Sequence, residues 1–111
     1  MQVYQWNEIN SLAVKQMGKP AVYVSNNLEY NTPRDEEIWL FIRDQCKTLW
    51  GDKTPEYHNA MLSLVWGGLF FFDTEEEQQE FYKIFTEPLT DSSAVYACSY
   101  RANGVCWNEN T

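Results

Sequence analysis

The side chains best suited to chemistry in this chain are one histidine and three cysteines. A nucleophilic cysteine would need His58 beside it as a base, and a zinc site would need three or four of these side chains together. They are scattered at positions 46, 58, 98 and 106 with no CxxC pair, and the chain has no GxGxxG motif or P-loop. The pattern therefore predicts no catalytic residues, no metal site and no cofactor.

Two of the cysteines, Cys98 and Cys106, flank the turn-forming residues 101–104. Because side chains alternate along a strand, a two-residue Asn103-Gly104 loop would place the thiols on opposite faces of a hairpin. A three-residue loop would place them on the same face. The odd number of cysteines is typical of a reducing compartment, so we expect buried thiols rather than a disulfide.

Acidic residues outnumber basic ones, with 16 Asp and Glu against 8 Lys and Arg and a net charge of −8. Several of them, including Glu75 and Glu76, begin predicted helices, where the helix dipole favours negative charge. Capping therefore accounts for these carboxylates without catalysis. The net charge disfavours direct binding to nucleic acid or to an anionic membrane and suits a basic partner. An alternative is that the carboxylates mimic DNA phosphates and inhibit a nucleic-acid-binding protein.

Aromatic residues make up 16% of the chain and include five tryptophans. Trp39, Arg43, Cys46 and Trp50 follow one another at one-turn spacing along a predicted helix, beside its core-facing side. Trp and Arg are enriched at the centres of protein interfaces. These observations make Trp39, Arg43 and Trp50, together with Trp107, Glu75 and Glu76, the candidate partner-binding residues.

The helices and strands that must position these groups have clear start and stop signals. Thr32-Pro33 and the Thr74–Glu77 capping box each begin a helix, and Gly51 and Pro88 end them. The predicted helices span residues 8–17, 32–50 and 74 to just before 88. β-Branched and aromatic runs predict strands at residues 20–24, 61–66, 69–72, 94–100 and 105–107, and residues 3–6 fit a further short strand.

From Pro20 onward the predicted order is strand, helix, strand, strand, helix, strand and an extra strand. This order matches the ferredoxin-like split β-α-β arrangement, an α+β fold with an antiparallel sheet and both helices on one face. The helix at residues 8–17, or a partner chain, would cover the other face. Gly67-Gly68 is interpreted as a hairpin turn, with a glycine bulge in one long strand as the alternative. Residues 1–111 form one domain.

The absence of a catalytic constellation favours a non-enzymatic protein-binding module. It would dock a protein through an aromatic or acidic surface, or dimerise through its open sheet face. The alternative is a small-ligand-binding or enzymatic domain, in which His58, Tyr23, Tyr96 and Glu109 would surround a pocket. No apolar run is long enough to span a bilayer and the N-terminus does not have the pattern of a signal peptide, so we expect a cytoplasmic protein.

Three short stretches resemble small uncharacterised proteins of tailed marine bacteriophages. The stretches are the helix entry at residues 71–77, the run at residues 95–98 and the closing residues 104–111. The resemblance covers less than half of the chain and implies no activity or site residue. It does imply expression in the cytoplasm of an infected bacterium, with a host or phage protein as partner.

Overall fold

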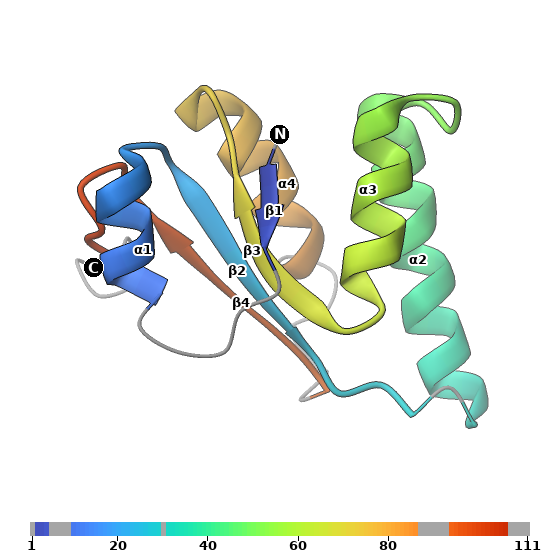
Figure 1. Cartoon of the computed structure of the whole chain (residues 1–111). Helices are drawn as coiled ribbons and strands as arrows, with labels where there is room; N and C mark the ends of the chain where they lie inside the picture. Colours follow the sequence, from blue (N-terminus) through green and yellow to red (C-terminus); the bar gives the residue numbers. More distant parts are fainter. Residues whose placement is uncertain (1, 5–9, 30, 87–93, 107–111) are drawn as a thin grey trace.

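Four antiparallel strands and four helices form the part of the chain that the computed structural model describes, which is residues 2–4, 10–29, 31–86 and 94–106. The fold class is α+β, as predicted. In chain order the elements are β1 (Gln2–Tyr4), α1 (Asn10–Met17), β2 (Ala21–Asn26), α2 (Pro33–Trp50), α3 (Pro55–Leu64), β3 (Gly67–Phe71), α4 (Glu75–Thr86) and β4 (Val95–Tyr100). Figure 1 shows α2 and α3 side by side at one end of the sheet and α1 at the other.

The strands lie in the order β1-β3-β2-β4, and every neighbouring pair is antiparallel. Strand β2 is central, because it pairs with β3 from position 21 to 25 and with β4 from position 21 to 26. Strands β3 and β4 are therefore parallel to each other, and the connection through α4 crosses over β2. The short strand β1 lies at the edge beside β3.

The predicted hairpin around Gly67-Gly68 is wrong. Residues 55–64 form helix α3, and Gly67 is the first residue of β3, where it pairs with Ser25. Thr54 caps α3, because its hydroxyl oxygen accepts a hydrogen bond from the Tyr57 amide at 3.2 Å. Thr54-Pro55 is the same start signal as Thr32-Pro33. The apolar run of residues 60–72 therefore contains the end of helix α3 and then a single strand, β3.

A glycine is required at position 67, where the chain passes from α3 into β3. Its φ is +90°, and a β-carbon on Gly67 would lie 2.5 Å from the backbone oxygen of Val24. The same junction is tied to the sheet by Asn26, whose side-chain amide donates to the carbonyl oxygen of Leu64 at 2.5 Å. The close approach of β3 to β2 therefore depends on a residue without a side chain.

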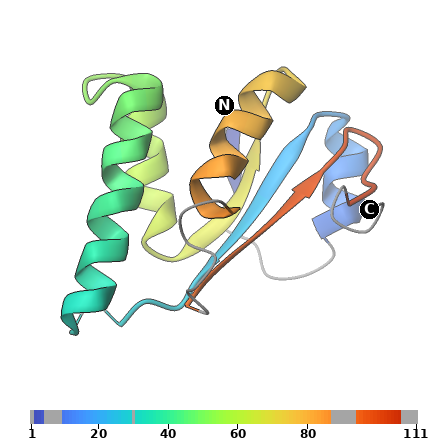
Figure 2. The same ribbon diagram turned by 180° about the vertical axis from the view of Figure 1, so that it is seen from behind.

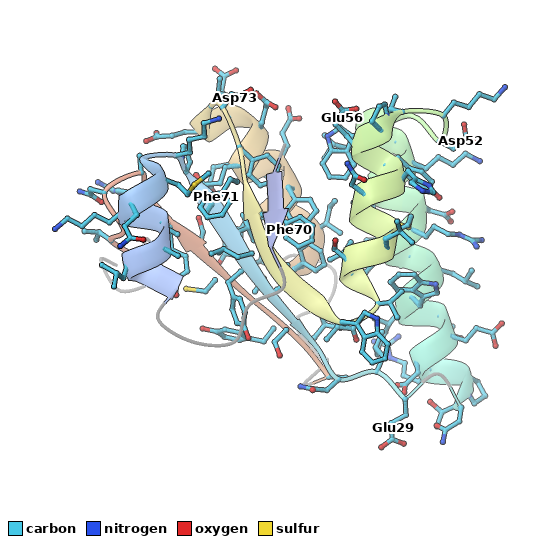
Figure 3. The ribbon with its side chains drawn as sticks, viewed as in Figure 1. Glu29, Asp52, Glu56, Phe70, Phe71 and Asp73 are labelled. Carbon is cyan, nitrogen blue, oxygen red and sulfur yellow. The ribbon has the colours of Figure 1, made fainter. Side chains whose placement is uncertain are left out.

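The two sheet faces carry different helices. Helices α2, α3 and α4 cover the first face, where the core includes Val22, Val24, Phe70 and Phe72. Helix α1 covers part of the second face, where Val14 packs with three strand residues, Ala21, Leu69 and Phe71. Figure 3 shows Phe70 and Phe71 pointing to opposite sides of β3, and Figure 2 shows α4 lying across the sheet. The sequence predicts two helices on one face, whereas the structure has three there, because residues 55–64 form a helix and not a strand. Helix α1 lies on the other face, which the sequence leaves to that helix or to a partner chain.

Helix α4 starts at the predicted capping box and is anchored by a buried glutamine. The Thr74 hydroxyl oxygen accepts from the Glu77 amide at 3.2 Å. Just before it, Asp73 accepts a hydrogen bond from Lys19 at 3.1 Å, and this contact lowers the pKa of Asp73. Gln78 is fully buried, and its side-chain amide donates to the carbonyl oxygens of Ala21 at 2.8 Å and Tyr100 at 2.5 Å. This anchor ties α4 to both β2 and β4.

The predicted helix at residues 32–50 is confirmed by α2, with Thr32 as its cap. The prediction for residues 8–17 agrees with α1, and its first two residues lie outside the described part of the chain. The final hairpin contains β4 and a single bridge between Tyr100 and Cys106, while residue 107 lies outside the described residues. Within the described ranges, no helix combines the length and apolar character needed to cross a membrane.

A glycine-to-alanine pair tests the junction between α3 and β3. Gly67→Ala should lower the free energy of unfolding by about 2–4 kcal/mol, because the new β-carbon meets backbone at a strained φ. Gly18→Ala should cost only about 1 kcal/mol, because Gly18 has a φ of +68° but no atom lies within 4 Å of the place that a β-carbon would take there. Urea unfolding measures both, and equal losses would contradict the close approach.

Candidate functional site

The predicted aromatic stripe on α2 lies partly in the core. Trp39 and Trp50 are half-buried against the first-face core, and Cys46 between them is fully buried. The ring of Trp50 lies 5.6 Å from the ring of Phe81 on α4, centroid to centroid. Burial also raises the pKa of the Cys46 thiol to about 12, which makes that thiol unreactive at neutral pH. The residues Trp39, Cys46 and Trp50 of this stripe therefore pack mainly in the core and expose little surface to a partner.

The remaining candidate partner-binding residues come from separate places. Arg43 is exposed on α2, and Glu75 and Glu76 are exposed in the first turn of α4. Trp107 lies outside the described residues. The acidic side chains that Figure 3 labels, including Asp73 and Glu56, project from the periphery of several elements.

The sheet separates His58 from Tyr23 and Tyr96, three of the four residues suggested for a ligand pocket. Tyr23 packs with α1 on the second face, and Tyr96 points to that face because it is two residues before Cys98, the register partner of Tyr23. His58 is exposed on α3, which packs on the first face. Glu109 lies outside the described residues. The described residues therefore do not bring these side chains together.

The most exposed large apolar side chains of the described residues are Trp66 at 74% and Leu62 at 61%. With Val65, which is 37% exposed, they form a group that we call the α3 outer stripe. Positions 62, 65 and 66 are three and four residues apart, so they share one side of the helix and its final turn. The opposite side of α3 packs into the core through Ala60 and Leu64.

Hydrogen bonds and the start of β3 fix the backbone next to the α3 outer stripe. Leu64 is buried, and its carbonyl oxygen accepts the hydrogen bond from Asn26. The Trp66 amide donates to the carbonyl oxygen of Ser63 at 3.2 Å, and the chain enters β3 at the next residue, Gly67. Because both flanks are anchored, little backbone entropy would be lost when the stripe meets a partner.

The sequence does not predict this stripe, because the pattern of residues 61–66 predicts a strand. A strand would alternate Leu62 and Leu64 with Met61 and Ser63, and it gives no reason for an apolar outer surface. The available signal was the Thr54-Pro55 helix start. Counting helical turns from Pro55 places positions 57, 60, 61 and 64 inward and positions 58, 62, 65 and 66 outward.

Comparisons with protein-family models, curated proteins and solved structures give no match for this chain. Among the described residues, no three His, Cys, Asp or Glu side chains are grouped so that they could hold a metal ion.

Two substitutions on α2 test whether the predicted stripe belongs to the core. Trp50→Ala should lower the free energy of unfolding by about 2–3 kcal/mol, because it removes a half-buried ring that packs on Phe81. Arg43→Ala, at an exposed position of the same helix, should change it by less than about 0.5 kcal/mol. Thermal and urea unfolding give both values. A Trp50→Ala variant as stable as the Arg43→Ala variant would place Trp50 at the surface instead.

Proposed function

We propose that this chain is a non-enzymatic protein-binding module that docks its partner through the α3 outer stripe. The observation that carries the proposal is the exposure of Trp66 and Leu62 beside each other on a helix whose other side is in the core. Burying these two side chains would contribute about 2–4 kcal/mol, or roughly 30- to 1,000-fold in affinity. Tryptophan is also the residue most enriched among interface hot spots.

The charge of the chain defines the kind of partner. With 16 acidic and 8 basic residues, the chain repels acidic proteins and attracts basic ones at long range. We therefore propose a partner with an apolar groove bordered by Lys and Arg side chains. Dimerisation through the sheet has less support, because α1 occupies part of the second face through Val14.

The finer description of the fold and the origin of the partner are also proposals. The crossover from β3 through α4 to β4, with β2 between the two strands, supports a ferredoxin-like description. The resemblance of residues 71–77, 95–98 and 104–111 to phage proteins supports a host or phage protein as partner, in a bacterial cytoplasm. In that setting the module would modulate or inhibit a host protein.

The other candidate functions have weaker support. A ligand pocket built from His58, Tyr23 and Tyr96 would have to span the sheet, since α3 and α1 pack on opposite faces. DNA mimicry would use acidic side chains such as Glu75 and Glu76, and capping already explains their place in the first turn of α4.

Affinity capture with matched variants tests the proposed surface. The Leu62→Gln/Trp66→Gln variant removes the stripe, and the Leu12→Gln/Val105→Gln variant removes two apolar side chains that are 48% and 41% exposed elsewhere. Lysate from cells that express the chain is passed over each protein, and the retained proteins are quantified by mass spectrometry. We expect a protein that the wild type and the control retain equally and that the stripe variant loses by at least about tenfold.

The purified partner should show the same order of affinities in a direct binding measurement. A captured protein that binds the stripe variant as tightly as the wild type would contradict the proposed surface. So would the absence of any protein that distinguishes the stripe variant from the control. Circular dichroism of all three proteins establishes that each is folded.

A further inference from the structure

The two cysteines near the C-terminal turn lie on one face of the same hairpin. The Arg101 amide donates to the carbonyl oxygen of Val105 and the Gly104 amide donates to that of Arg101, both at 2.8 Å. Gly104 has a φ of +87°, and Tyr100 bridges to Cys106 in antiparallel fashion. These bonds define a three-residue loop, residues 102–104, with its glycine in the left-handed region.

The three-residue loop places the thiols of Cys98 and Cys106 on the same face of the hairpin, which is one of the two arrangements that the sequence allows. With Tyr100 opposite Cys106, Cys98 is two residues back along β4 and points to the same face as Cys106. The two sulfur atoms lie 2.7 Å apart, and one thiol donates a hydrogen bond to the other. The sulfurs would need only a small further approach to reach the roughly 2.05 Å of a disulfide bond.

The surroundings keep this pair apart from the third cysteine. Cys98 and Cys106 are buried, at 5% and 7% exposure, on the face that also carries Tyr23. Cys46 is buried in the first-face core on α2. Only one pairing of the three cysteines is therefore supported by the fold, and it closes a short loop within one hairpin.

We propose that Cys98 and Cys106 form a redox modification site, which an oxidising low-molecular-weight disulfide such as glutathione disulfide converts to an intramolecular disulfide. This inference stands apart from the proposed docking function. The hairpin turn lies at the α1 end of the molecule, whereas α3 lies at the other end (Figure 1).

The reaction proceeds by two thiol–disulfide exchanges. The thiolate of one cysteine attacks a sulfur of glutathione disulfide, which forms a mixed disulfide and releases one glutathione thiolate. The thiolate of the other cysteine attacks the protein sulfur of that mixed disulfide and releases the second glutathione thiolate. The two cysteine protons end on the released thiolates. The protein pair loses two electrons and the glutathione disulfide gains them.

Burial makes the exchange slow in the closed hairpin. Desolvation, with a hydrogen bond to Cys106 acting in the same direction, raises the pKa of Cys98 to about 11. Little Cys98 thiolate therefore exists at neutral pH. Attack requires opening of the turn, whose residues Arg101, Asn103 and Val105 are exposed. Once formed, the disulfide would tie residue 106 to β4 and restrict the unfolded chain.

The experiment uses the full chain with reduced or oxidised glutathione under native conditions. The exchange is then stopped with acid and the protein is unfolded in denaturant. Alkylation and mass spectrometry count the free thiols, and digestion maps any disulfide. We expect the wild type to keep one alkylatable thiol, at Cys46, and to contain a Cys98–Cys106 linkage within one chain. The melting temperature should rise by about 5–15 °C and fall again when a reductant is added.

Variants identify the pair. Cys46→Ala should still form the linkage, whereas Cys98→Ser and Cys106→Ser should show no rise in melting temperature and at most one glutathione adduct. Three alkylatable thiols in oxidised wild-type protein would overturn the proposal. It would also be overturned by linkages that join separate chains, that include Cys46, or that appear only in urea. Because digestion maps the wild type itself, the result does not depend on the folding of any variant.

Discussion

The packing of Phe81 is the interaction on which the rest of the first-face architecture depends. Its side chain is fully buried, and its ring lies 4.9 Å from Phe70, 5.4 Å from Phe72 and 5.1 Å from Phe85, centroid to centroid. Trp50 adds a fourth ring at 5.6 Å. One side chain of α4 therefore contacts β3, the segment that follows it and the end of α2. Pairs of this kind contribute beyond the area that they bury.

This aromatic cluster explains why the two tryptophans of α2 are half-buried while the large apolar side chains on the outer side of α3 are exposed. The half-buried Trp39 and Trp50 complete the core around Phe81, so α2 presents mainly polar side chains outward. Helix α3 is added at the edge of this core through Ala60 and Leu64, and Leu62 and Trp66 on its outer side are mostly exposed. Polar anchors complete the arrangement, with Asn26 holding the end of α3 and Gln78 holding α4 on the sheet.

Local signals were enough to predict α2, α4 and the central strands. Thr32-Pro33 and the Thr74–Glu77 box satisfy backbone groups within a few residues, so their effect can be derived from sequence. Gly67 could not be assigned this way, because a turn and a strand start both accept positive φ, and only the approach of Val24 distinguishes them. The length of the loop after Tyr100 likewise depends on the strand register. No local signal in the sequence predicts the burial of Gln78, because that burial follows from its hydrogen bonds to β2 and β4.

If the α3 outer stripe binds a partner, as we propose, folding should not require its side chains. Urea unfolding of the Leu62→Gln/Trp66→Gln variant measures whether folding requires them. Because both side chains are mostly in solvent, the free energy of unfolding should stay within about 0.5 kcal/mol of the wild-type value. A loss of about 2 kcal/mol or more would show that the two side chains belong to the core and are not free to bind a partner.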